Sequence, residues 1–238
     1  MSGRRTIPPG TALLIATRNA HKAREIREVL GEDVLYLTLM DFPGAPVAAE
    51  DGETFAANAA RKASALAGWL AAHSSRLLEK LEEPEILLYV VADDSGLEVD
   101  ALGGAPGVHS ARFAAQEVAG AANSPDRANN AKLLRLLETV PAPKRTGRFR
   151  CVLAVSRLTF AASARKFLFL PAAATILFEG VCEGRISLKP AGGGGFGYDP
   201  LFIPNGQSQS FAELGGAVKN TLSHRAIALR KLKDYLAK

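Results

Sequence analysis

The chain has few cysteines and no long apolar stretch. Its only two cysteines, Cys151 and Cys182, lack the C-x-x-C spacing of a zinc knuckle or a redox pair. We therefore expect two buried thiols in a reducing cytoplasm. No run approaches the ~18 apolar residues of a membrane span, and residues 1–17 lack the apolar core of a secretory signal. These absences predict a cytoplasmic protein without a membrane partner.

The sequence also lacks internal repeats and two common nucleotide-binding motifs. Neither the P-loop pattern G-x-x-x-x-G-K-[ST] nor the dinucleotide fingerprint G-x-G-x-x-G follows the first apolar run. Apolar residues make up 47% of the 238 residues, which is ample for one core. The net charge of +5 fits either a polyanionic ligand or a mildly basic surface, and we expect no stable nucleic-acid partner.

Apolar runs and helical periodicity alternate along the chain and predict a mixed α/β fold with helices flanking a sheet. We expect strands at residues 12–16, 34–38, 85–92, 97–99, 148–156, 158–169, 175–182 and 185–188. Helices are expected at residues 22–30, 54–72, 126–137 and 223–236, with a charged extension over 74–85 and Asp126 as the cap of the third. We expect a single domain over 1–238, in which residues 142–190 could form a β-rich lobe.

The first polar segment, residues 17–22, reads Thr-Arg-Asn-Ala-His-Lys and lies between a strand and a helix. Open α/β sheets bind ligands at this end of a strand. Helix N–H groups and the Lys22 ammonium could hold a phosphate, and Asn19 could cap the helix or bind the ligand. A plain capped loop is the alternative.

The second segment is Ala92-Asp93-Asp94-Ser95-Gly96, which follows a buried strand and which we expect to form a turn. Adjacent carboxylates there are unfavourable unless a cation offsets them. Mg²⁺ favours one or two carboxylates together with phosphate oxygens and waters, and a carboxylate could orient a water as general base. The alternative is a turn whose aspartates bind local N–H groups.

A loop and helix before this segment carry further candidates. Glu50 could reach Mg²⁺ from the loop. Asn58 and Lys62 are four residues apart and share a helical face. A solvated surface position is the alternative for Lys62.

Two segments near the C-terminus could recognise a base. Glycines at 192–195 are followed by Phe196-Gly197-Tyr198-Asp199, where either ring could stack on a base, although a flexible loop is the alternative. Lys219, His224 and Arg225 lie at or before the start of the last helix, which Ser223 can cap. Cations there oppose the helix dipole and suggest a bound anion, or donors for a purine O6, rather than an ordinary basic helix start.

Taken in order, these segments resemble the inosine triphosphatase family, also called the non-canonical purine NTP pyrophosphatases. The similarity runs from about residue 12 to the C-terminus. It rests on residues 17–25 (TxNxxKxxE), 54–63 (TFxxNAxxKA), 92–97 (ADDSGL), 101–107 (ALGGAPG), 110–112 (SAR), 194–200 (GGFGYDP) and 223–225 (SHR). Residues 68–85 and 157–178 are longer than the family pattern. Arg18 replaces a common glycine, which puts a left-handed backbone there in doubt.

The resemblance implies an elongated mixed sheet, two lobes with a central nucleotide cleft, a homodimer, and Mg²⁺-dependent hydrolysis of ITP, dITP and XTP to the monophosphate and pyrophosphate. It implies that Asp94 is the general base and a metal ligand. It ties a loop acid to Mg²⁺, here Glu50, with Asp51 or Glu53 as alternatives. We expect Lys62 to hold the triphosphate. The resemblance implies these further nucleotide contacts: Thr17, Arg18, Asn19, Ala20, His21, Lys22, Ser95, Phe196, Gly197, Tyr198, Asp199, Lys219, His224 and Arg225.

Two rival functions remain open on the sequence. A nucleotide or RNA binder without catalysis would use the same basic segments, but it would not need paired carboxylates. A pyrophosphatase of similar fold could instead act on modified pyrimidines. A substrate panel separates these possibilities.

Overall fold

The computed structural model describes residues 6–81, 86–115, 123–171 and 175–238. The chain divides into two compact units. The first comprises Met1–Asp94, Val152–Phe178 and Ala228–Lys238, and the second comprises Ser95–Cys151 and Glu179–Ile227. The single domain over 1–238 and the β-rich lobe stay predictions.

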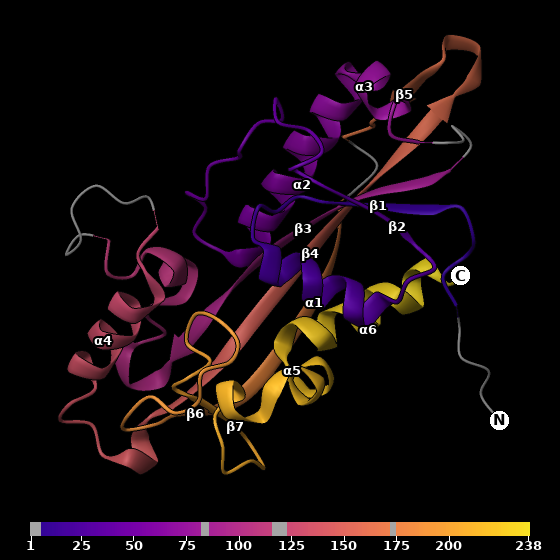
Figure 1. The fold of residues 1–238 in the computed structure, drawn as a ribbon. Helices are drawn as coiled ribbons and strands as arrows, with labels where there is room; N and C mark the ends of the chain where they lie inside the picture. The colour runs from indigo at the N-terminus through magenta and orange to yellow at the C-terminus, as the bar shows by residue number, and fades with distance from the viewer. Residues whose placement is uncertain (1–5, 82–85, 116–122, 172–174) are drawn as a thin grey trace. The chain divides into compact units, whose positions relative to one another are not determined.

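Seven strands form one sheet in the order β2-β1-β3-β4-β6-β7, with β5 paired to β4 (Figure 1). β1 is parallel to β2 and β3, whereas β5 and β7 are antiparallel to β4 and β6. This confirms the predicted mixed α/β fold. The strands are β1 (Thr11–Ile15), β2 (Leu35–Thr38), β3 (Leu87–Val99), β4 (Thr146–Ala161), β5 (Lys166–Leu168), β6 (Ile176–Ile186) and β7 (Phe202–Pro204).

Three of the longer strands differ from the predicted ones. β4 spans the strand expected at 148–156 and the first part of the one expected at 158–169, within which β5 forms a separate later strand, and β6 replaces those expected at 175–182 and 185–188. No proline lies at either expected break, so the pairing continues. β3 runs through Asp93 and Asp94 without the expected turn.

The core of the first unit lies between β1, β3 and α2 (Phe55–Ala72). Leu14, Val90 and Leu70 are fully buried in it. The two segments longer than the family pattern meet beside this core. Where these segments meet, α3 (Ser74–Leu78) lies against β5, and the Phe167 N–H donates to Ser74 Oγ at 2.9 Å. The predicted helical extension ends with α3, and its residues 82–85 lie outside the described residues.

The second unit has its own core between β3, β4, β7, α4 (Asp126–Leu136) and α5 (Phe211–Leu222). α5 was not predicted as a full helix, because Gly215, with φ +77°, breaks its regular geometry and its periodicity. Ser210 and Glu213 form a capping box that starts it. The prediction that Asp126 caps α4 is wrong, because Pro125 occupies that position and the Asp126 carboxylate binds a loop instead.

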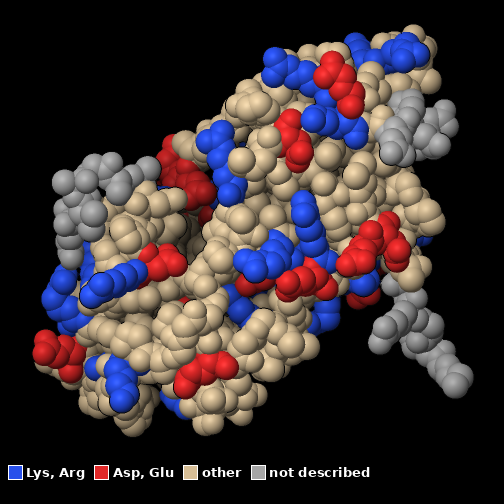
Figure 2. Space-filling model, in the orientation of Figure 1, with Lys and Arg blue, Asp and Glu red and all other residues tan. Residues whose placement is uncertain are grey.

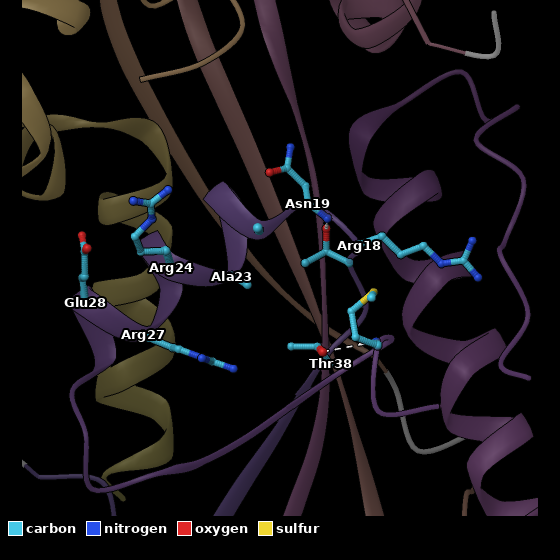
Figure 3. Close-up of a pocket in the computed structure, with 10 residues that line it drawn as sticks. Arg18, Asn19, Ala23, Arg24, Arg27, Glu28 and Thr38 are labelled. Carbon is cyan, nitrogen blue, oxygen red and sulfur yellow. Dashed lines mark hydrogen bonds between the residues drawn. The ribbon is translucent and has the colours of Figure 1, made fainter. Parts of the chain in front are cut away.

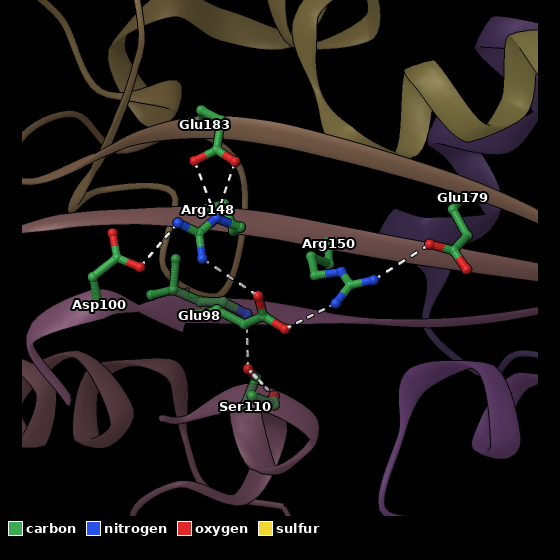
Figure 4. Close-up of polar contacts among 9 residues, drawn as sticks. Glu98, Asp100, Ser110, Arg148, Arg150, Glu179 and Glu183 are labelled. Atoms are coloured by element: carbon green, nitrogen blue, oxygen red, sulfur yellow. Dashed lines mark hydrogen bonds and ion pairs between the residues drawn. The ribbon is translucent and has the colours of Figure 1, made fainter. Parts of the chain in front are cut away.

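Two arginines of β4 join neighbouring strands of the second unit (Figure 4). Arg148 and Arg150 pair with the carboxylates of Glu98, Asp100, Glu179 and Glu183, which lie on or beside β3 and β6. Such half-exposed pairs contribute little stability each. On the face drawn in Figure 2, basic and acidic side chains are interspersed. None of the helices in the described ranges is long and apolar enough to cross a membrane.

The remaining helices follow the predicted local signals. α1 (Ala20–Leu30) follows β1, and α6 (His224–Leu236) ends the chain. Asn19 caps α1, and Thr54 caps α2 by accepting from the Ala57 N–H at 3.1 Å. These caps satisfy N–H groups that a helix start leaves open.

Cys151 and Cys182 are buried free thiols, as predicted. Burial raises the pKa of the Cys182 thiol to about 11. At pH 8 such a thiol is about one part in a thousand thiolate, against roughly a quarter for an ordinary one. We expect an aromatic disulfide reagent to modify native Cys182 about 100-fold more slowly than the unfolded chain, with the rate increasing as the pH approaches 11. Stopped-flow absorbance with a Cys151→Ser variant checks this, and equal rates would contradict it.

Candidate functional site

The first unit places polar residues at a point where the sheet connections diverge. β1 lies between β2 and β3 and is parallel to both. Its chain leads through α1 to β2, and β2 leads through α2 to β3. Right-handed connections to either side of one strand put α1 and α2 on opposite faces, and ligands bind at the carboxyl end of such strands.

The loop after β1 has an ordered backbone. Asn19 Oδ1 accepts from the N–H groups of His21 at 2.9 Å and Lys22 at 3.2 Å, and Thr17 Oγ1 accepts from the Asn19 N–H at 3.1 Å. Arg18 does not adopt a positive φ; among the described residues other than glycine, only Arg165 does. The backbone at Arg18 is therefore not left-handed, in line with the replacement of the common glycine.

A pocket of about 450 Å³ opens beside this loop (Figure 3). Figure 3 shows Arg18 extending from the loop on one side and Arg24 and Arg27 extending from α1 on the other. The Arg24 guanidinium lies 3.0 Å from His21 Nδ1, and Arg27 lies over the Tyr36 ring. Arg18 and Arg24 lie near the start of α1, where arginines are well suited to phosphate oxygens, whereas Arg27 lies in its last turn.

The two adjacent aspartates of β3 pair with different helices. Successive side chains of a strand point to opposite faces. Asp93 pairs with the Lys22 ammonium of α1, whereas Asp94 Oδ1 lies 2.8 Å from the Lys62 Nζ of α2. β1 pairs with β3 only as far as Val91, so both carboxylates lie just past the end of that pairing. Because the two side chains point to opposite faces, each buried carboxylate pairs with a different lysine.

Asp94 and Glu50 share one ammonium group. Lys62 Nζ lies 2.5 Å from Glu50 Oε1 and 2.8 Å from Asp94 Oδ1. Asn58, which is fully buried, donates through Nδ2 to Asp94 Oδ2 at 3.1 Å and accepts from the Gly52 N–H at 2.8 Å. Asn58 thus links the acidic loop to the catalytic candidate on β3.

Burial and neighbouring charges have opposite effects on the pKa values of Asp94 and Lys62. Burial raises the pKa of Asp94, and Lys62 and Lys22 only partly offset it. Burial lowers the pKa of Lys62, but the carboxylates of Asp94 and Glu50 outweigh burial, so its pKa is raised. The pair therefore holds a carboxylate with increased proton affinity beside a firmly charged ammonium.

The Asp94 and Glu50 oxygens suit a magnesium ion, although the described residues contain no group of three His, Cys, Asp or Glu side chains arranged to hold a metal ion. Asp94 and Glu50 already converge on one cation, the Lys62 ammonium. Mg²⁺ needs only one or two carboxylates when phosphates and waters complete its shell. Asp51 instead pairs with Arg61, so the geometry favours Glu50 over Asp51 as the loop acid.

In the second unit, the glycine–aromatic loop gathers two cations at one ring. Lys219 Nζ lies 4.4 Å from the centre of the Phe196 ring, and Arg225 Cζ lies 5.7 Å from it. Asp199 Oδ2 accepts from Lys219 Nζ at 2.6 Å and from the Phe196 N–H at 2.8 Å. Asp199 therefore holds both the ring's backbone and the cation beside it.

Arg225 is a charged side chain with 1% of its surface exposed. It donates through Nη2 to Ser95 Oγ at 2.8 Å, next to Asp94 in the chain. Ser223 Oγ accepts from the Ala226 N–H at 3.2 Å, which confirms the predicted cap of α6. Cations at a helix start are unfavourable unless an anion or an electron-rich group offsets them.

Two predicted contact residues lie deeper than expected. Tyr198 is buried, its hydroxyl donates to the Ser110 carbonyl at 2.9 Å, and burial raises its pKa. The His224 ring is buried and stacks on Phe149 with 4.7 Å between ring centres. This placement favours Phe196 as the stacking ring and Arg225 as the donor to a base.

A model of the Ham1 family matches residues 13–235 of the sequence. The chain belongs to the Ham1 family. Two relatives named dITP/XTP pyrophosphatase are similar to this Ham1 chain over almost its whole length. That of Shouchella clausii is 42% identical over 94% of the chain and 96% of the relative, and that of Geobacillus kaustophilus is 44% identical over 93% and 92%.

Solved Ham1 structures have the same fold. A HAM1 protein from Coxiella burnetii aligns with a TM-score of 0.72 at 31% identity, covering 95% of this chain and 98% of that one. A protein from Mycobacterium abscessus, described as a nucleoside-triphosphatase and dITP/XTP pyrophosphatase, aligns with a TM-score of 0.64 at 34% identity, covering 93% and 98%. The predicted membership of the inosine triphosphatase family is thereby confirmed.

Sequence reasoning missed two contacts of α4 in this Ham1 chain. Asn130 Nδ2 donates to the Gly197 carbonyl at 3.0 Å, and Asp126 Oδ2 accepts from the Gly197 N–H at 2.6 Å. The available signal was the spacing of Asp126 and Asn130, two polar residues four apart that share one face of α4. Gly197 lies 67 residues after Asn130, so no local sequence pattern could identify it as the partner.

Proposed function

We propose that this chain hydrolyses non-canonical purine nucleoside triphosphates, namely ITP, dITP and XTP, to the monophosphate and pyrophosphate, and so cleanses the nucleotide pool. The observation that carries the proposal is the buried Asp94 carboxylate, which contacts Lys62 and Asn58 just past the end of the β1 pairing. Relatives more than 40% identical, named dITP/XTP pyrophosphatase, support this activity.

The first unit supplies the groups for the triphosphate. The Asn19-capped start of α1, with Lys22 beside it, suits phosphate oxygens. We assign Lys62 to the phosphate nearest Asp94, because its ammonium already bridges Asp94 and Glu50. Thr17, Arg18, Ala20 and His21 complete the proposed contacts.

Asp94 and Glu50 are the residues that would hold Mg²⁺. The ion supplies charge neutralisation and polarisation of the phosphorus when it is bound. Asp94 orients the attacking water and accepts its proton, and the raised pKa of its buried carboxyl makes it a better acceptor than an exposed aspartate. The bond that breaks joins the α-phosphorus to the bridging oxygen, so pyrophosphate leaves.

Residues of the glycine–aromatic loop and of the start of α6 are the proposed groups for the base. Phe196 stacks on the purine, and Arg225 donates to its 6-keto oxygen, with Ser95, Gly197, Tyr198, Asp199, Lys219 and His224 around them. Adenine presents an amino donor at that position and would leave buried donors without acceptors. A cytoplasmic homodimer with no stable nucleic-acid or membrane partner belongs to the same proposal and rests on the family resemblance.

A substrate panel tests the proposal. We expect pyrophosphate release from dITP, ITP and XTP with kcat/KM at least about 10²-fold above that for ATP, since unpaired buried donors discriminate strongly. GTP and UTP complete the panel, and removal of Mg²⁺ with a chelator should abolish release. Binding of ITP without turnover would support a non-catalytic nucleotide binder. Preference for a pyrimidine nucleotide would support a pyrophosphatase that acts on modified pyrimidines.

A further inference from the structure

The start of α4 contacts the loop that carries Phe196. Asp126 and Asn130 are four residues apart and so share a helical face. Asp126 Oδ2 accepts from the Gly197 N–H at 2.6 Å, and Asn130 Nδ2 donates to the Gly197 carbonyl at 3.0 Å. One face of α4 therefore binds both backbone polar groups of Gly197.

These hydrogen bonds fix the backbone on both sides of Phe196. The Phe196 N–H donates to Asp199 Oδ2 at 2.8 Å, and the next amide, that of Gly197, donates to Asp126. Rotation about either backbone bond of Phe196 would break one of these contacts. Gly197 has φ +63°, a left-handed conformation that glycine adopts readily, and Asn130 binds the carbonyl beyond it.

We propose that Asp126 and Asn130 are positioning residues for purine recognition. They set the backbone of Phe196, and through it the ring that lies 4.4 Å from Lys219 Nζ and 5.7 Å from Arg225 Cζ. Neither residue contacts the substrate in this account. The inference rests on the proposed function, because it assigns Phe196 to the base.

Burial distinguishes the two contacts. Asn130 is 8% exposed, and its Oδ1 has no hydrogen-bond partner among the described residues, so its amide serves Gly197. Its neighbour Asn129 has a different task, since its side chain binds the backbone of Ala111, Ala114 and Ser124. Asp126 is exposed, and water can replace part of its bond. Loss of the Asn130 donor is therefore expected to have the larger effect.

The test compares a ligand that has a base with one that lacks it. Calorimetry with Mg²⁺ present measures the Kd of dIMP and of pyrophosphate for the whole chain. Asn130→Asp removes the donor and places a carboxylate against the Gly197 carbonyl, so dIMP should bind about tenfold more weakly. Asp126→Ala should weaken dIMP about threefold, and Asp126→Asn should recover part of this because its amide oxygen still accepts.

Pyrophosphate should bind within about twofold of the wild type in all these variants, because it makes no contact with the base site. In turnover, the KM for dITP should rise while kcat stays within about threefold. Glu138→Ala, which removes an exposed carboxylate just past the end of α4, is the matched control and should change neither Kd.

Three outcomes decide the inference. Weaker dIMP with unchanged pyrophosphate supports it. Unchanged dIMP in Asp126→Ala and Asn130→Asp, or equal weakening of both ligands, overturns it, and Asp126→Ala decides alone if the buried variant does not fold. A wild-type chain that releases no pyrophosphate from dITP refutes the proposed function itself, which is a separate result.

Discussion

Asp94→Asn is expected to reduce pyrophosphate release from dITP by on the order of 10³-fold. The variant keeps the shape of the side chain but removes the charge that Mg²⁺ and the attacking water's proton require. Steady-state release at saturating Mg²⁺ measures the loss. Folding should survive, because burial raises the pKa of Asp94 and the folded state therefore disfavours its charged form. Thermal unfolding should give a Tm equal to or above that of the wild type.

Asp93→Asn is the matched comparison for this variant. Asp93 lies next in the strand but pairs with Lys22 rather than Lys62. We expect a smaller loss, mainly as a higher KM, since Lys22 would lose its orientation toward the phosphates. Full activity of Asp94→Asn would refute its catalytic role, and equal losses in both variants would remove the distinction between them.

Arg225→Ala is expected to lower kcat/KM for dITP by on the order of 10²-fold and to lower that for dATP much less. Arg225 is almost fully buried, lies near the Phe196 ring and donates to Ser95. Its loss removes a donor that a 6-keto purine accepts and adenine cannot use. Competition between dITP and dATP in one reaction measures the ratio directly.

Arg225→Lys is the control for charge at this position. Lysine keeps the cation but lacks the fork of donors, so only part of the discrimination should return. Truncation of a buried arginine also leaves a cavity, so circular dichroism must first show that both variants fold. A loss of the same size on dITP and dATP would refute base reading by Arg225.

Local chemistry allowed much of the fold to be predicted. The apolar run at 12–16 and the caps Asn19, Thr54 and Ser223 gave β1, α1, α2 and α6 with small errors at their ends. Each signal lies within a few residues of the structure it specifies. The lysine at position 62 could likewise be placed on the face of Asn58 by spacing alone.

Features that depend on distant partners could not be predicted. The acidic pair was expected in a turn, yet β3, which also neighbours β4 in the sheet, continues through it beyond Val91, the last residue paired with β1. Asp126 had the sequence position of a cap, but its oxygen binds Gly197. The sequence pattern suggested that Tyr198 stacks on a base, but its hydroxyl donates to the Ser110 carbonyl. In each case a partner far along the chain decides the outcome.

The two segments longer than the family pattern show the same limit. Their extra length was visible in the sequence, and their packing against each other was not. Ser74 of one binds the Phe167 N–H of the other. Their contact lies beside the core of the first unit and involves none of the proposed site residues.

Hydrolysis of dITP in oxygen-18-labelled water tests the central claim most directly. A single turnover with Mg²⁺ present, followed by mass spectrometry of the products, shows which phosphorus receives the water oxygen. We expect one labelled oxygen in dIMP and unlabelled pyrophosphate, because the water that Asp94 orients attacks the α-phosphorus. Label in pyrophosphate would contradict that attack, and formation of dIDP with inorganic phosphate would contradict the proposed reaction altogether.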